Sequence, residues 1–266
     1  MTETPVWGRY SELRPQELED ILTSVPIAYV PWGALEWHGP HLPLGTEGYI
    51  AESIAERAVM RTGGVLLPTT WWPIAPIPNR FSVGLRSDVI QELWDSLFAE
   101  LARIGFRVVV LLTGHHGYGH DLVLMDAAEH ALATYDLLVL AIPPLALVDE
   151  QMLDHAAHWE TALMLALRPR LTALEVLDGQ LIDVGTTGVL GTDPRSATAP
   201  QGEAAIKLAI ERIALSVRAL QTRGGADILR ELYARRRMFS QEYVERYFRG
   251  SWEDAIAEWW REQERK

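Results

Sequence analysis

The chain has 266 residues, of which 48% are hydrophobic and 23% charged, which is the composition of an ordinary globular protein and excludes a largely disordered one. Its formal net charge of −12 argues against a nucleic-acid-binding surface, which is usually basic, and the three arginines at 235–237 are typical of a solvated helix face. Because the chain contains no cysteine, disulfides and thiolate metal sites are excluded, and any metal ligands must be His, Asp, Glu or water.

The sequence carries no sign of a membrane segment or a secretory leader. Its first ten residues lack the basic region and apolar stretch of a signal peptide, and no apolar run reaches the roughly 20 residues that span a bilayer. We therefore expect a cytoplasmic protein with neither a membrane nor a nucleic acid as its partner.

Short apolar runs rich in β-formers alternate with longer segments of helical period. The runs are 26–31, 65–68, 108–112 and 137–142, and the helical segments are 49–61, 89–104 and 122–134. The hydrophobicity of the runs is continuous rather than alternating, which is typical of parallel strands covered on both faces. Helical connections are the usual link between such strands. We predict an α/β fold with three layers, α/β/α, around a mostly parallel sheet.

The last part of the chain differs in composition from the rest. Residues 181–194 are rich in glycine and are predicted to be an irregular loop, and 201–222 are predicted to form an amphipathic helix. Residues 226–266 are rich in Arg, Glu, Tyr and Trp, which is too aromatic for a free tail. We predict an α/β domain over 1–225 and a helical extension over 226–266 that packs on the domain or on a neighbouring subunit.

The first polar cluster follows the first predicted strand. Residues 32–47 read WGALEWHGPHLPLGTE, at the strand end where ligands collect in open α/β sheets. Glu36 and His38 are two residues apart, so their side chains leave the same face of an extended segment. Taken alone, this pair also fits a Pro/Gly turn with incidental polar residues.

Two more clusters occupy equivalent places. Residues 113–120 (TGHHGYGH) follow the third predicted strand and hold three of the chain's eight histidines. Residues 154–169 (DHAAHWETALMLALRP) follow the fourth strand and open a helix. His155 and Glu160 would be about 140° apart on a helix, so they share a site only if His155 precedes it. Glu160 adjoins an apolar stretch, where an acid is costly to bury unless it is paired or bound to a metal.

Together these segments would bring three carboxylates and two imidazoles to one edge of the sheet. Three negative charges repel one another in a low-dielectric cleft, and two divalent cations would offset them. Such ions also lower the pKa of water and polarise carbonyl groups. Mixed oxygen and imidazole ligands suit zinc, manganese or iron rather than copper. The sequence therefore predicts a metal-dependent hydrolase.

At these residues the sequence resembles the creatininase family of metal-dependent amidohydrolases. The family's first motif, roughly E-x-H-G-P-H-L-P-L-x-T-D, matches EWHGPHLPLGTE at 36–47 at every fixed position but the last. Three later motifs, N-G-H-x-x-N, H-A-G-x-x-E-T-S and G-D-P-R-x-A, are echoed in order by 113–118, 155–162 and 191–197. The resemblance runs from about residue 8 to residue 222 and implies a creatininase-like fold, a hexameric homo-oligomer and a small-molecule substrate.

The resemblance also implies a centre with two divalent metal ions. By position, Glu36 and His115 would bind one ion, and His38 and Glu160 the other. Glu47 would bridge both.

Three further roles follow from the same resemblance. His155 matches the family's catalytic histidine, which would carry a proton from the attacking water to the leaving nitrogen. His41 is expected behind the metal ligands, orienting one of them. His116 and Trp159 are expected behind the ligands or against the substrate.

Three departures from the family pattern bear on the metals and the substrate. Glu47 replaces the usual Asp, which leaves a single tightly bound metal as an alternative to two. Gly117 stands where creatininase itself supplies a carboxylate ligand, which favours Glu160 as the donor. The segment 73–88 lacks the common F-P-G-T stretch and is expected to shape the substrate pocket. Creatinine itself is therefore not the expected substrate.

Three functions remain open from the sequence. The leading one is hydrolysis of a C–N bond in a cyclic or linear amide by metal-activated water. A second is C–C ring opening of a keto-inositol of the dehydro-inosose type, with Arg80 and Arg86 contacting substrate hydroxyls. A third is a non-catalytic descendant that uses the fold for binding or assembly, because a fold does not fix a function.

Overall fold

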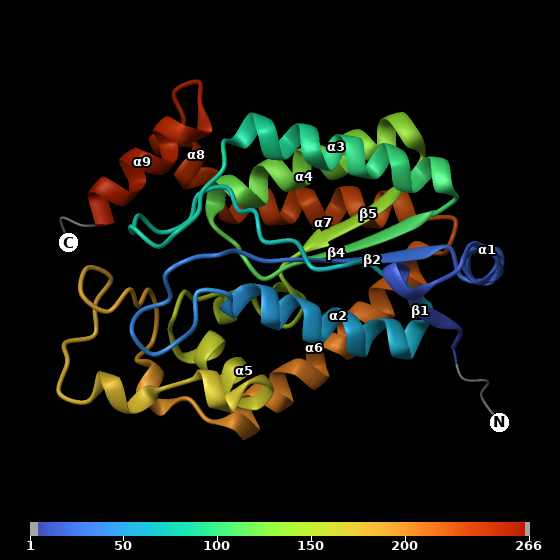
Figure 1. Ribbon diagram of the computed structural model, residues 1–266. Helices are drawn as coiled ribbons and strands as arrows, with labels where there is room; N and C mark the ends of the chain where they lie inside the picture. The colour runs from blue at the N-terminus through green and yellow to red at the C-terminus, as the bar shows by residue number, and fades with distance from the viewer. Residues whose placement is uncertain (1–4, 264–266) are drawn as a thin grey trace.

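The computed structural model describes residues 5–263, which form a five-stranded sheet between two layers of helices (Figure 1). The strands are β1 (Trp7–Arg9), β2 (Ile27–Trp32), β3 (Gly64–Leu66), β4 (Val108–Thr113) and β5 (Leu138–Ile142). Their order is β1-β3-β2-β4-β5, and each neighbouring pair is parallel. The predicted three-layer α/β fold is confirmed. The three-residue β1 was not predicted, because so short a strand gives no periodic signal.

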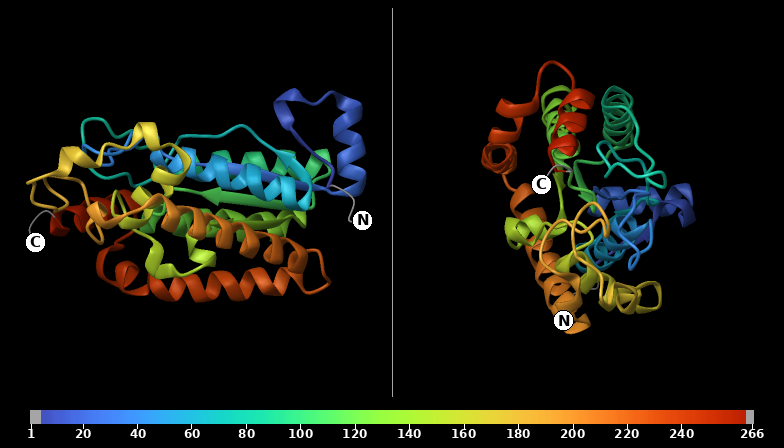
Figure 2. Two further views of the ribbon diagram at one scale, coloured as in Figure 1. Left: turned by 90° about the horizontal axis from the view of Figure 1, so that it is seen from below. Right: turned by 90° about the vertical axis from the view of Figure 1, so that its left-hand side faces the viewer.

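Helices cover both faces of the sheet. They are α1 (Pro15–Ser24), α2 (Thr46–Thr62), α3 (Ser87–Ile104), α4 (Tyr118–Tyr135), α5 (His158–Leu167), α6 (Ala199–Leu220), α7 (Gly225–Phe239), α8 (Gln241–Tyr247) and α9 (Trp252–Gln263). Helices α2, α5 and α6 lie on one face, and α3 and α4 on the other (Figure 1). Strand β1 and helix α9 lie at opposite ends of the molecule (Figure 2). Among the helices of residues 5–263, none is both long and apolar enough to cross a bilayer.

The two central strands, β2 and β4, end side by side. Both are buried along their whole length, as their continuous apolar sequences require. The last residue of β2, Trp32, is the register partner of the last residue of β4, Thr113. The loops that follow the two strands therefore leave the sheet at one point, where their polar side chains can meet.

Glycines allow the first turn of α2 to lie directly on these strand ends. A Cβ on Gly114 would be 2.2 Å from the backbone oxygen of Glu47, and a Cβ on Gly33 would be 2.2 Å from the Cα of Gly48. Any larger residue would force the backbones apart. Helix α2 begins at Thr46, three residues before the predicted start, so Glu47 lies in its first turn rather than in the preceding loop.

The C-terminal helices are fastened to the free edge of β5. The hydroxyl of Tyr233 on α7 donates to the carbonyl of Val139 and accepts a hydrogen bond from the amide of Ala141 at 3.0 Å. The side chain thus satisfies backbone groups that an edge strand otherwise leaves unpaired. Residues 225–263 pack on the α/β part of the same chain, and the division into two units at residue 225 stays a prediction.

Candidate metal centre

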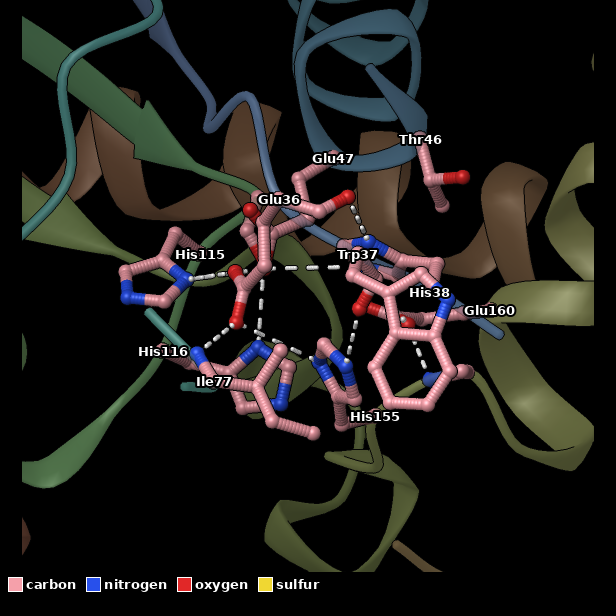
Figure 3. A network of polar contacts seen from close by, with 12 residues as sticks. Glu36, Trp37, His38, Thr46, Glu47, Ile77, His115, His116, His155 and Glu160 are labelled. Carbon is pink, nitrogen blue, oxygen red and sulfur yellow. Dashed lines mark hydrogen bonds and ion pairs between the residues drawn. The ribbon is translucent and has the colours of Figure 1, made fainter. Parts of the chain in front are cut away.

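The loop after β2 places Glu36 and His38 above the sheet edge (Figure 3). The His38 ring donates through Nδ1 to the backbone oxygen of Glu36 at 3.0 Å, which turns Nε2 towards two carboxylates. Nε2 lies 3.3 Å from Oε2 of Glu160 and 3.8 Å from Oε1 of Glu47. An imidazole whose second nitrogen is fixed by a backbone carbonyl is the usual arrangement of a metal ligand.

The loop after β4 presents His115 in the same way. Its Nε2 donates to the backbone oxygen of Ile74 at 2.8 Å. Its Nδ1 lies 2.9 Å from Oε2 of Glu36 and 2.9 Å from Oε1 of Glu47. The nitrogen available for a ligand therefore faces both carboxylates.

The segment before α5 supplies the third part of the centre. His155 precedes this helix, which meets the condition for sharing a site with Glu160, and its backbone pairs with that of Leu190. The ring donates through Nε2 to the carbonyl of Trp37 at 3.0 Å, and Nδ1 lies 3.8 Å from Oε1 of Glu36. Glu160, in the first turn of the helix, is 4% exposed.

Some polar atoms at this point are buried and have no hydrogen-bond partner. They are Oε2 of Glu47 and Oε1 of Glu160, whereas Oε2 of Glu36 and Nε2 of His38 have only the charged neighbours His115 and Glu160. A buried acceptor without a partner is costly, and divalent cations bound between these side chains would satisfy such atoms. The donor set of carboxylates and imidazoles also matches what zinc, manganese and iron accept. The residues present therefore fit a metal centre.

Two groups of potential ligands share Glu47. One group comprises Glu36, His38, Glu47 and His155, and the other comprises Glu47, His116 and Glu160, with the candidate ligand atoms of each group within 4.8 Å of one another. His116 donates through Nδ1 to the carbonyl of Gly114 at 3.0 Å, which leaves Nε2 for a ligand. The structure thus brings together the five residues predicted as ligands, and it places His116 and His155 within reach as well.

Protons on two histidines offset the acids when no cation is present. Burial lowers the pKa of His38, but the charge and hydrogen bond of Glu160, together with the charges of Glu47 and Glu36, outweigh burial and raise this pKa to about 10. Burial likewise lowers the pKa of His115, whereas Glu47 and Glu36 raise it well above its usual value. Because these two protons lie where cations would bind, metal binding must displace them.

His155 behaves differently from those two histidines. Burial and then the charge of His38 lower the pKa of His155 to about 4. The imidazole is therefore neutral at pH 7, with its hydrogen on Nε2 and a free lone pair on Nδ1. A neutral imidazole in this tautomer can accept a proton at the centre.

The remaining predicted residues lie farther out. His41 is buried, with Nε2 at 3.2 Å from the hydroxyl of Thr161, the neighbour of Glu160, so it touches the helix that carries a candidate ligand. Trp159 packs its ring against His158 and does not line the cavity above the centre.

Sequence reasoning assigned no role to Asp154. Its carboxylate accepts from the backbone amides of Trp159 at 2.7 Å and Glu160 at 3.1 Å, so it caps the start of α5. Burial and then Glu160 raise its pKa to about 7. An Asp shortly before a helical pattern is a recognisable capping signal, and it could have been used here.

The divergent segment 73–88 contributes backbone groups. The carbonyl of Ile74 fixes His115, and the amide of Ile77 donates to Oε1 of Glu36 at 2.6 Å. His120 accepts from the amide of Ile74 at 3.2 Å and so fastens this segment to α4. Backbone donors and acceptors leave no signature in a sequence, so these contacts could not be predicted.

A cavity of about 360 Å³ opens above the centre. Its inner wall includes Glu36, Glu47, His115 and His155. Neither Arg80 nor Arg86, which might have contacted a polyhydroxylated substrate, lines it. They lie over the ring of Phe81 and beside Asp88.

Known proteins resemble this chain in sequence and in fold. The model of the family described as "Creatininase: Creatinine amidohydrolase" matches residues 11–217. The creatinine amidohydrolase of Pseudomonas putida is 25% identical over 231 residues, which cover 77% of this chain and 89% of that protein. The mycofactocin precursor peptide peptidase of Mycolicibacterium smegmatis is 28% identical over 208 residues, which cover 67% and 79%. The solved structure named "Creatininase Mn" superposes with a TM-score of 0.69 at 21% identity, and the match covers 81% of this chain and 98% of that one.

The sequence motifs, the order of the ligand-bearing loops and the family match agree over the same part of the chain. The match spans well over half of the 266 residues. This chain therefore belongs to the creatininase family of metal-dependent amidohydrolases.

Proposed function

We propose that this protein hydrolyses the C–N bond of a cyclic or linear amide at a centre of two divalent metal ions. The observation that carries the proposal is the buried cluster of carboxylates and imidazoles around Glu47, in which Oε2 of Glu47 and Oε1 of Glu160 have no hydrogen-bond partner. Zinc, manganese and iron are the candidate ions.

The ligands divide between two positions. Glu36 and His115 would hold one ion, which is supported by the 2.9 Å approach of Nδ1 to Oε2. His38 and Glu160 would hold the other, which is supported by their 3.3 Å separation. Glu47 would join the two, because it belongs to both groups of potential ligands. Ions bound there would polarise the amide carbonyl and lower the pKa of water.

His155 would carry the proton in this reaction. Its Nδ1 faces the centre, while the carbonyl of Trp37 keeps the other ring hydrogen on Nε2. Nδ1 therefore accepts a proton from the attacking water and returns it to the leaving nitrogen, with no change at Nε2. Burial, which lowers the pKa of this ring, keeps it neutral in the resting state, so that the lone pair of Nδ1 is free.

Metal analysis combined with a substrate panel tests the proposal. The protein is stripped with a chelator, reloaded with zinc or manganese, and assayed for bound metal and for release of amine from lactams, formamides and short peptides. We expect stoichiometric metal and hydrolysis of at least one amide class. Turnover of keto-inositols alone would replace the reaction by C–C ring opening. Absence of stoichiometric metal after loading would favour a non-catalytic binding protein.

A matched pair of variants ties the result to the centre. Glu36→Gln keeps the size of the side chain but removes a charge among the ligands, and we expect it to lose both metal and turnover. Glu203→Gln makes the same chemical change at an exposed residue paired with Arg57, and we expect no effect. If Glu36→Gln retained full metal and activity, the assignment of this carboxylate would be wrong.

The substrate size, the cellular location and the oligomeric state of the protein are also predictions. A small-molecule substrate and a hexameric homo-oligomer are expected from the resemblance to the family, and the cytoplasmic location stays a prediction from the sequence. Light scattering of the purified chain would measure the oligomeric state directly.

A further inference from the structure

The C-terminal helices α7, α8 and α9 form a wall of the cavity that the family match does not include. That match ends at residue 217, whereas α7 begins at Gly225. The outer part of the cavity is nevertheless lined by residues of all three helices, among them Phe239, Tyr243 and Trp259. The centre and its outer wall therefore come from two parts of the chain.

We propose that this outer wall is a substrate-binding subsite for a planar aromatic group that carries no carboxylate. The proposal rests on the proposed amide hydrolysis and names the class of substrate: an amide whose non-reacting end is aromatic. The subsite comprises Tyr118, Tyr243 and Trp259, and it is called the aromatic wall below.

The aromatic wall starts directly beside the candidate ligands. Tyr118 lies two residues after His116, and both line the cavity. The ring of Tyr118 stacks on Tyr243 of α8 with centroids 4.8 Å apart and planes inclined by 23°. Trp259 of α9 meets Tyr118 edge-on at 6.0 Å. A further aromatic ring placed against this group would gain stacked or edge-on contacts in addition to the burial of its surface.

The helices that carry the wall are held by a buried arginine on α7 and by a hydrogen-bonded carboxylate at the start of α9. Arg236 on α7 pairs with Asp121 of α4 at 2.8 Å and with Glu150 at 2.9 Å, and its side chain is 6% exposed. At the start of α9, Glu253 accepts from the amide and hydroxyl of Ser87 at 2.7 Å each. A subsite whose position is set before binding loses little entropy when its ligand arrives.

The same ion pairs decide the charge that the subsite accepts. Arg236 is the single Lys or Arg among the described residues that line the cavity, and two carboxylates already surround it. Asp121 and Glu150 leave this outer region with an excess of negative charge. A carboxylate on the outer end of the substrate would meet repulsion and find no free cation, so neutral or cationic rings are expected.

Binding measured without turnover tests the subsite. Isothermal titration of the metal-free and the metal-loaded protein uses three probes: benzamide, cyclohexanecarboxamide and 4-carbamoylbenzoate, whose carboxylate points away from the amide. We expect benzamide to bind several-fold more tightly than the saturated ring and roughly tenfold more tightly than the anionic ring. Equal affinities for benzamide and cyclohexanecarboxamide, or no heat with benzamide at millimolar concentration, would overturn the proposal.

Variants locate the binding to the aromatic wall. Trp259→Leu and Tyr118→Leu remove rings of the wall from two different helices, and the melting temperature of each variant shows whether the C-terminal helices stay in place. We expect each to weaken benzamide roughly 3- to 10-fold and to leave cyclohexanecarboxamide unchanged. Phe248→Leu removes a ring of the same C-terminal segment that packs on Trp252 and does not line this cavity, and it should leave both affinities unchanged.

The two proposals fail in different ways. Ring-dependent binding without hydrolysis of any amide would refute the proposed reaction and keep the subsite. Hydrolysis that shows no preference for aromatic amides, with unchanged affinities in both wall variants, would refute the subsite and keep the reaction.

Discussion

Gly114 gives the sharpest test of how the fold positions the centre. In Gly114→Ala the new Cβ would lie 2.2 Å from the backbone oxygen of Glu47, whereas ordinary contact begins at 3.4 Å. The first turn of α2 must therefore retreat by about 1.2 Å. Overpacking of this kind costs about 1–3 kcal/mol, which lowers the melting temperature by roughly 2–12 °C for a domain of this size.

The larger effect falls on the metal centre. Glu47 is the carboxylate shared by both groups of potential ligands, so its retreat disturbs both positions at once. Displacement of a catalytic group by ~1 Å commonly costs about 10²-fold in rate. We expect turnover to fall by about this factor and bound metal to decrease by mass analysis.

A second glycine provides the control. A Cβ on Gly224 would meet nothing within 4 Å, and its φ of −95° is open to any residue, so Gly224→Ala should leave metal content and activity unchanged. If Gly114→Ala retained full metal and turnover, the close approach of α2 would not be what positions Glu47. Equal losses in both variants would point to a general effect of adding a methyl group.

Three further outcomes follow from the histidines of the centre. His155→Ala should keep the metal and lose about 10²- to 10⁴-fold in turnover; loss of metal in this variant would instead make the ring a ligand. Metal affinity should rise with pH near neutrality, because the ions displace protons from His38 and His115, and titrations in buffers of different ionisation enthalpy would measure the released protons. The metal-free protein should lose stability as pH rises from about 6.5 to about 10, because the pKa of His38 is higher in the folded than in the unfolded state. A melting temperature that does not change over that pH range would contradict the protonation of His38 in the folded metal-free protein. The metal-loaded protein is the control.

The sequence could predict the central part of this arrangement because its causes are local or topological. Continuous apolar runs identified β2 and β4, and parallel strands bring their carboxyl ends to one edge. Glu36 and His115, in the loops after these strands, were therefore expected to meet. His155 could be placed only conditionally, because its contribution depends on whether α5 starts before or after it.

Other parts of the site depend on packing that no local pattern encodes. The carbonyl of Ile74 and the amide of Ile77 hold two candidate ligands through backbone atoms alone. The aromatic wall needs α4 to meet α8 and α9, which lie more than a hundred residues later in the chain. Sequence composition predicted that residues 226–266 pack on the domain or on a neighbouring subunit. It could not indicate that helices of this segment reach the cavity.

The base and the mouth of the cavity differ in how strongly electrostatics restricts their residues. At its base, Glu36, Glu47 and Glu160 form a concentration of charge that only cations or protons can offset, so substitutions there are severely restricted. At its mouth, Arg236 pairs with two acids whose combined charge exceeds its own, and the aromatic wall itself carries no charged side chain. Substitution of an aromatic residue at the mouth loses only packing contacts. Loss of a carboxylate at the base changes the charge of the whole centre. Differences in substrate between relatives should therefore arise at the mouth, from elements such as α7–α9, while the metal chemistry stays the same.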